Sequence, residues 1–132
     1  MAIIPHITES EWLIMHELWK DSPLTAAQLV ERVQAQKGLV ATTIKTLLRR
    51  LISKNAVRFT IDENNAKLYY YYPNVTEEEC IEKQSKHFLS LYYGGNVNKM
   101  LATFVDDSQL SGEEIDQLKD LLDAKKKTLE EE

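Results

Sequence analysis

Residues 42–54 read TTIKTLLRRLISK, and this stretch decides the fold that we expect for the chain. At about 100° per residue it forms a helix with one apolar face and an opposite face that is polar and basic. The apolar face holds Ile44, Leu47, Leu48, Leu51 and Ile52. The opposite face holds Thr42, Thr46, Arg49 and Ser53, flanked by Lys45, Thr43 and Arg50. Such a helix packs on a core with one face and offers the other to a partner.

Capping boxes predict the starts of four further helices. In this motif a Ser or Thr at the N-cap stands three residues before a Glu or Gln. The apolar residue before the cap packs against the apolar residue after the Glu or Gln, and this contact is called a hydrophobic staple. The four pairs are Thr8 with Glu11, Thr25 with Gln28, Thr76 with Glu79, and Ser111 with Glu114. The helices that they predict lie near residues 8–20, 25–36, 76–92 and 111–130. Another helix is predicted from the spacing of Val97, Met100, Leu101, Phe104 and Val105.

The periodicity changes from helical to alternating after residue 56. Residues 57–61 read VRFTI, residues 62–65 read DENN, and residues 68–72 read LYYYY before Pro73. Alternating and aromatic segments around turn residues predict a β-hairpin. The fold class is therefore mainly α-helical with a small β-hairpin. Three helices followed by a hairpin make a winged helix, a helix-turn-helix variant whose third helix enters the DNA major groove.

The charge is divided unevenly along the chain and indicates two modules. The net charge is −5 overall, but residues 1–73 carry nine Lys/Arg against seven Asp/Glu, and residues 74–132 carry seven against fourteen. Between residues 37 and 61 there are six basic residues and no acidic one. A surface that faces phosphates needs this local absence of carboxylates. We therefore expect a DNA-binding domain at 1–73 and a second helical domain at 74–132.

Composition excludes several classes of protein. The chain has 132 residues, of which 43% are hydrophobic and 28% charged, as is typical of a globular protein. No apolar run approaches the roughly 18 residues that span a membrane, so we expect no membrane insertion and a cytoplasmic location. The only cysteine, Cys80, excludes an internal disulfide and a thiolate cluster.

Catalytic and metal-binding motifs are missing from the sequence. There is no Gly-rich phosphate loop and no nucleophile motif, so we expect neither an enzyme nor a cofactor. The histidines, which are His6, His16 and His87, do not share a metal-binding spacing. Tyrosines 69–72 could stack on nucleic acid bases, but alternate tyrosines of a hairpin strand pack on the core, and we favour that interpretation.

Motifs along nearly the whole chain point to one family. They read ITESE at 7–11, TIKTLLRRL at 43–51, LYYYYPN at 68–74 and DSQLSGE at 107–113. In this combination they resemble the penicillinase repressor family of bacterial transcription factors, which covers β-lactamase, methicillin-resistance and copper-responsive repressors. The resemblance implies a homodimer with an N-terminal winged helix and a C-terminal three-helix dimerisation module. It also implies binding to double-stranded palindromic operator DNA with a TACA/TGTA core.

The resemblance and the helical wheel together give the expected DNA contacts. By position, the family's contact residues correspond to Thr42, Thr43, Thr46 and Arg50. From their charge and place, we expect Lys45, Arg49, Lys54 and Arg58 to contact phosphates. Val40 replaces a small polar cap of close relatives and Thr42 replaces a basic residue, which leaves the preferred operator sequence open.

Apolar stripes in the second half predict the dimer interface. Three short helices cannot bury so many apolar side chains by themselves, so a second subunit is expected to cover them. The dimerisation residues that we predict are Ile81, Phe88, Tyr92, Met100, Leu101, Phe104, Ile115, Leu118 and Leu122.

The mode of release from DNA depends on the branch of the family. The copper branch carries C-terminal Cys-x-Cys motifs, and no cysteine follows Cys80 here. The β-lactam branch is cleaved at an Asn-Phe bond after a membrane receptor signals, and the matching bond here joins Thr103 to Phe104. We therefore expect proteolysis there by a protease linked to a membrane sensor. Two alternatives remain: release by a small molecule or metal, and a protein-interaction module without specific DNA binding.

Overall fold

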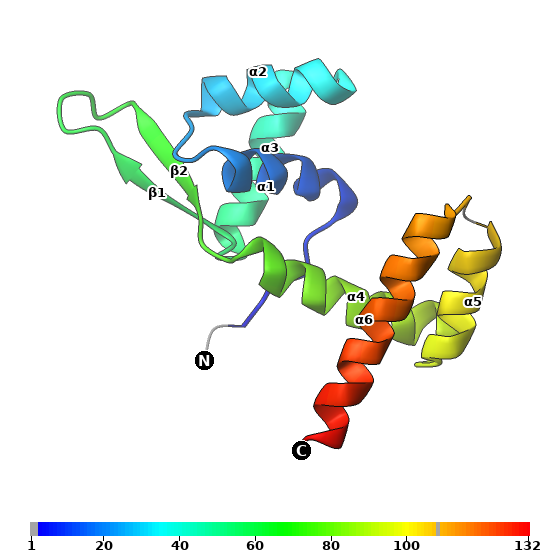
Figure 1. The fold of residues 1–132 in the computed structure, drawn as a ribbon. Helices are drawn as coiled ribbons and strands as arrows, with labels where there is room; N and C mark the ends of the chain where they lie inside the picture. Colours follow the sequence, from blue (N-terminus) through cyan, green and yellow to red (C-terminus); the bar gives the residue numbers. More distant parts are fainter. Residues whose placement is uncertain (1–2, 108) are drawn as a thin grey trace. The chain divides into compact units, whose positions relative to one another are not determined.

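The structure, a computed structural model, describes residues 3–107 and 109–132 (Figure 1). Its elements are α1 (Glu9–Lys20), α2 (Ala26–Lys37), α3 (Ala41–Ser53), β1 (Val57–Ile61), β2 (Tyr69–Pro73), α4 (Glu77–Tyr93), α5 (Val97–Asp107) and α6 (Gly112–Glu130). The predicted helices and strands are all present, and wherever ends were predicted the observed ends lie within one residue of them. The expected fold class is confirmed. Ser108 of the DSQLSGE motif, like residues 1–2, lies outside the described residues.

Two compact units make up the chain, Met1–His87 and Phe88–Glu132. The division falls inside α4, whereas the sequence predicted a domain boundary after residue 73. The first turns of α4 belong to the first unit because Val75 and Cys80 are buried in its core. The boundary at residue 73 stays a prediction about function, since it marks where the winged-helix elements end.

The core of the first unit is formed mainly by α1, α2, α3 and the start of the hairpin, with contributions from the connecting segments and the first turn of α4. Side chains from all four are almost fully buried, and removal of such apolar area from water is the main favourable term in folding. Its members are Ile7, Ile14, Met15, Leu18, Leu24, Leu29, Val33, Ile44, Leu47, Leu48, Leu51, Ala56, Val57, Val75 and Cys80. The apolar face predicted for residues 42–54 is therefore the face that fixes α3 to the unit.

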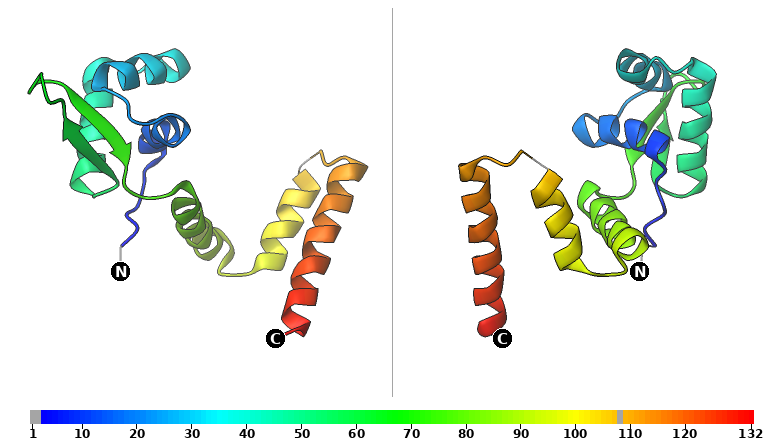
Figure 2. Two further views of the ribbon diagram at one scale, coloured as in Figure 1. Left: turned by 60° about the vertical axis from the view of Figure 1, so that its left-hand side comes forward. Right: turned by 90° about the vertical axis from the view of Figure 1, so that its right-hand side faces the viewer.

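The hairpin extends from this helical core as the wing (Figure 2). β1 and β2 pair antiparallel, with Val57 opposite Pro73 and Phe59 opposite Tyr71. Leu24, in the loop before α2, adds a third short segment. Its backbone exchanges two hydrogen bonds with Tyr71, at 2.8 and 3.2 Å. Helices and wing thus form one unit with the arrangement of a winged helix.

The second unit buries no side chain in α5 or α6. An aromatic contact joins α4 to α5, with the ring centroids of Phe88 and Phe104 6.1 Å apart. Phe104 is nevertheless 45% exposed in the single chain. In the described part of the chain, no helix is long and apolar enough to cross a membrane.

Candidate nucleic-acid interface

The outer face of α3 is a polar surface next to the wing. Burial of Ile44, Leu47, Leu48 and Leu51 turns the opposite side of the helix to solvent. The exposed side chains of this face are Thr42, Thr43, Lys45, Thr46, Arg49, Arg50 and Ser53. We call these seven residues the α3 face. The sequence therefore predicted which side chains of α3 are exposed together.

A shallow hollow opens on the α3 face. It is lined by Thr42, Thr43, Thr46, Leu47 and Arg50. The Thr46 hydroxyl donates a hydrogen bond of 2.9 Å to the Thr42 carbonyl, which fixes the orientation of its side chain. Threonine methyl groups, threonine oxygens and an Arg guanidinium are the groups that contact thymine methyls and guanine edges in the major groove. The hollow thus combines apolar and hydrogen-bonding groups suited to base edges.

Positive charge on the α3 face has no acidic partner among the residues that the structure describes. The first turn of α3 contains no acidic residue, and its N-cap, Val40, makes no side-chain hydrogen bond. Among residues 3–107 and 109–132, the basic members of ion pairs are Lys20, Arg32, Lys54 and Lys86. Lys45, Arg49 and Arg50 are absent from that set. The N-terminal end of a helix also favours anions, so both features attract phosphate.

Lys54 differs from the other predicted phosphate contacts. Its ammonium donates a 2.6 Å hydrogen bond to Oε1 of Glu11 and a 3.0 Å bond to the His6 carbonyl. Glu11 is completely buried. Burial would raise the pKa of the Glu11 carboxyl, but Lys54 and the Thr8 backbone N–H together hold this pKa below its ordinary value. We therefore remove Lys54 from the predicted phosphate contacts, because it is committed to an internal ion pair.

Arg58 lies on the wing, where its guanidinium stacks 4.2 Å from the centroid of the Tyr72 ring. The stacked arrangement orients the guanidinium while its N–H groups remain available. On the other face of the hairpin, the rings of Phe59, Tyr69 and Tyr71 contact one another, and Tyr71 packs against the core. The packing interpretation of the tyrosine run is confirmed for Tyr71.

Two buried carboxylates of α1 were not singled out from the sequence. Glu11 was predicted only as a capping residue, and Glu17, 4% exposed, was not predicted at all. Glu17 accepts a 2.6 Å hydrogen bond from Gln36 and lies 3.8 Å from Arg32, which links α1 to α2. One signal was available: Glu11 stands at helical spacing from the buried Ile14, Met15 and Leu18, on the same stripe.

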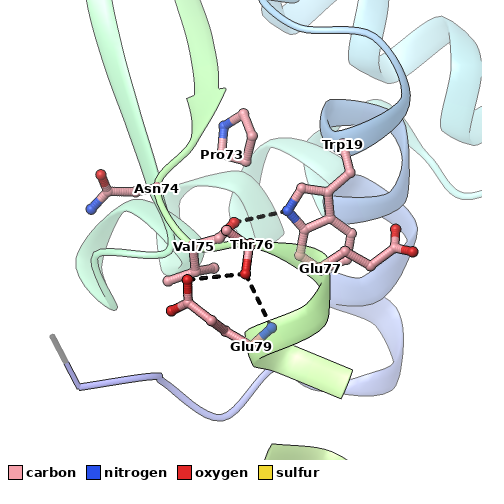
Figure 3. Close-up of a pocket in the computed structure, with 7 residues that line it drawn as sticks. All are labelled: Trp19, Pro73, Asn74, Val75, Thr76, Glu77 and Glu79. Carbon is pink, nitrogen blue, oxygen red and sulfur yellow. Dashed lines mark hydrogen bonds between the residues drawn. The ribbon is translucent and has the colours of Figure 1, made fainter. Parts of the chain in front are cut away.

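A second pocket lies at the base of the wing, beside the start of α4 (Figure 3). Its lining residues are Trp19, Pro73, Asn74, Val75, Thr76, Glu77 and Glu79. The Trp19 indole donates a 2.9 Å hydrogen bond to the Val75 carbonyl. The Thr76 hydroxyl donates a hydrogen bond to the Glu79 carboxylate and accepts one from the Glu79 backbone N–H. The first bond joins α1 to the linker between β2 and α4, and the others cap the start of α4. These polar groups are already engaged within the chain, which favours a structural role for this region.

The histidines and Cys80 are dispersed through the first unit. His16 contacts the rings of Trp12 and Trp19, and His6 meets His87 edge to face at 6.1 Å. Cys80 is buried, and desolvation raises the pKa of its thiol. Over the part of the chain that the structure describes, no three His, Cys, Asp or Glu side chains are grouped as metal ligands.

Comparisons with known proteins agree with this geometry. A family model described as "Penicillinase repressor" matches residues 7–124. The penicillinase repressor of Bacillus licheniformis is 33% identical over 96% of each chain. The regulatory protein MecI of Staphylococcus aureus (strain N315), a methicillin resistance protein, is 33% identical over 90% of this chain and 94% of its own. The solution structure of the Bacillus licheniformis BlaI monomeric form in complex with the blaP half-operator has a TM-score of 0.51. It is 28% identical and covers 60% of this chain and 93% of that one. The chain belongs to the penicillinase repressor family.

Proposed function

We propose that the protein is a transcriptional repressor that binds double-stranded operator DNA through the α3 face. The observation that carries this proposal is the exposed α3 face, whose Lys45, Arg49 and Arg50 have no acidic partner among the described residues. Its place as the third helix of a winged helix supports entry into the major groove. A repressor acts on DNA, so we place the protein in the cytoplasm.

Two groups of contacts follow from the positions on the α3 face. We assign base-edge contacts to the residues of the hollow, Thr42, Thr43, Thr46 and Arg50. We assign phosphate contacts to Lys45 and Arg49, and to Arg58 on the wing. The first group would determine which sequence is bound, and the second would supply affinity for any duplex.

Titration of the full-length protein with duplex DNA tests this proposal. One duplex carries a palindrome with TACA/TGTA half-sites and the other carries the same bases shuffled. At physiological salt we expect the palindrome to bind at least about 10³-fold more tightly. Equal affinities for the two duplexes would reduce the protein to a non-specific binder. Absence of binding to either would favour the protein-interaction alternative.

We further propose that the protein is a homodimer formed through the C-terminal helices. Large apolar side chains of these helices are exposed in the single chain, which is costly in water unless a partner covers them. They are Ile81, Phe88, Leu91, Tyr92, Val97, Phe104, Val105, Ile115, Leu121, Leu122 and Leu129. The predicted interface residues Met100, Leu101 and Leu118 are half-buried. A two-fold dimer would place its recognition helices about one DNA turn, roughly 34 Å, apart on a palindrome.

Release from DNA is proposed to occur by cleavage of the Thr103–Phe104 bond in α5. Helices must open locally before a protease can bind them, and a helix without buried side chains opens at little cost. None of the side chains of α5 is buried within the single chain, so only the proposed dimer interface would oppose its opening. A cut there would separate α6 from the DNA-binding unit and remove part of the dimer interface. The protease would be linked to a membrane sensor.

Co-expression of the protein with its sensor, followed by addition of the inducer, tests this mode of release. Mass spectrometry is expected to find a new C-terminus at Thr103. A Phe104→Ala variant, which keeps α5 helical and removes the aromatic side chain that follows the bond, is the control and is expected to be cut more slowly. Release of full-length protein from DNA during induction would instead indicate a ligand or a metal, and the cleavage proposal would be wrong.

A further inference from the structure

The N-terminal segment lies between the recognition helix α3 and the helix α4 that leads out of the first unit. Residues 3–7 precede α1 and have no regular secondary structure. Ile7 is buried in the core and anchors the segment at one end. We call residues 3–7 the strap. Its backbone carbonyls are its main points of attachment on both sides.

On the α3 side, the strap is hydrogen-bonded to Lys54, the C-cap residue of this helix. The Lys54 ammonium donates to the His6 carbonyl at 3.0 Å and to the buried carboxylate of Glu11 at 2.6 Å. The other oxygen of Glu11, Oε2, is buried without a hydrogen-bond partner among the described residues. The Glu11 carboxylate thus depends on Lys54 for compensation of its charge, and this holds Lys54 against the strap.

On the α4 side, two consecutive residues donate hydrogen bonds to backbone carbonyls of the strap. The Gln84 side-chain amide donates to the Ile7 carbonyl at 2.8 Å and lies 3.3 Å from Nδ1 of His6. The Lys83 ammonium donates to the Ile4 carbonyl. The ring of His6 also meets that of His87. His6 therefore contacts the cap of α3 through its carbonyl and contacts α4 through its ring.

In the described part of the chain, few other contacts hold α4 beyond Cys80 to the rest of the first unit. Cys80 is the only buried side chain of the helix. Beyond Cys80, α4 contacts the strap through Lys83, Gln84 and His87. The strap in turn accepts a hydrogen bond from Lys54. The chain of bonds from α4 to the end of α3 is polar and specific, so it fixes a defined position in a way that a loose apolar contact does not.

We propose that the strap fixes α4 to the recognition helix and thereby sets the distance between half-sites that the dimer accepts. Lys83 and Gln84 are positioning residues in this account, because they act on DNA binding through α4 and do not touch DNA. The inference rests on the proposed function, since it needs a dimer on a two-part operator. Affinity for two linked half-sites depends steeply on whether both can be reached without strain.

The test compares the full-length wild type with the double variant Lys83→Met and Gln84→Leu. These changes keep the side-chain volumes and remove the donors to the strap. Ser85→Ala is the matched control, because Ser85 is exposed on the same turn of α4. For each protein we would measure thermal unfolding, affinity for a duplex with a single half-site, and affinity for palindromes whose half-sites are moved apart or together by one and two base pairs.

We expect wild type and Ser85→Ala to show the same sharp optimum of spacing. The double variant is expected to keep its single half-site affinity, to lose about tenfold at the optimum and to bind the neighbouring spacings almost equally well. An unchanged spacing profile would overturn the inference. A uniform loss on every duplex, the single half-site included, together with earlier unfolding, would show a merely structural role and would also overturn it. If wild-type protein bound two half-sites no better than one, the proposed function itself would fail, and the strap proposal with it.

Discussion

Arg50 shares its hollow with three threonines, and this position predicts a role in reading sequence. We expect Arg50→Ala to cost about 1–3 kcal/mol of operator binding, because a bidentate contact to a base edge is lost. The loss should be largest at one base-pair position and should nearly vanish on shuffled DNA. Fluorescence anisotropy titrations on single-base operator variants would measure it. Equal losses of affinity for the operator and the shuffled duplex would indicate that Arg50 contacts a phosphate and not a base edge.

The buried ion pair of Glu11 is expected to make the folded protein less stable at acidic pH. The pKa of Glu11 is lowered in the folded protein, so its stabilising contribution is complete above the pKa of an unfolded-state Glu. This contribution is lost as the pH falls through the lower, folded-state pKa. We therefore expect wild-type protein to lose stability between about pH 5 and pH 3 more steeply than Glu11→Gln. Chemical unfolding at several pH values measures both slopes, and parallel curves would contradict the assignment.

Interactions between near neighbours in the sequence could be predicted for these residues, but interactions between distant ones could not. Local patterns predicted the exposed side chains of α3 and the capping role of Glu11, since both depend on neighbours a few residues away. The ion pair of Glu11 with Lys54 joins residues 43 positions apart. A basic residue in an acid-free stretch looks the same whether it faces phosphate or a distant carboxylate. For that reason the sequence alone predicts a phosphate contact at Lys54.

The start of α3 is the helix end where stability and function are expected to conflict. Its N-cap, Val40, has extended backbone angles that suit a capping side chain, yet it supplies no hydrogen bond. We expect Val40→Ser and Val40→Asp each to raise the free energy of unfolding by about 1 kcal/mol. Only Val40→Asp should weaken DNA binding, because its carboxylate would face phosphate. Urea unfolding and duplex titration measure the two effects. Equal binding by both variants would place this helix end away from the DNA backbone.

The boundaries of helices and strands could be predicted because their signals are local. Capping boxes and the change of period after residue 56 lie within a few residues of the ends that they determine. The pairing of Leu24 with Tyr71 could not be predicted, since a single residue pair between a loop and a distant strand leaves no periodic pattern. The same holds for the continuation of the first unit into α4, which depends on the burial of Val75 and Cys80.

The whole molecule is expected to be a dimer, and its C-terminal helices supply the test. We expect the full-length wild type to sediment as a dimer at micromolar concentration. Leu122 is 51% exposed in the single chain, so Leu122→Glu should cost the monomer little stability. The same change would bury a charge in the proposed interface and should therefore shift the protein from dimer to monomer. Asp123→Ala, the neighbouring exposed position, is the control. A dimeric Leu122→Glu protein would exclude this part of α6 from the interface.

The salt dependence of operator affinity tests whether the α3 face binds DNA. Each neutralised phosphate contributes about 0.9 to the slope of log K against log salt concentration. We predict a steep negative slope for the wild type, a slope reduced by about one per protomer for Arg49→Ala, and no change for Lys119→Ala on α6. If Arg49→Ala kept the wild-type slope and affinity, or if wild-type binding did not depend on salt, the α3 face would not be the surface that binds DNA.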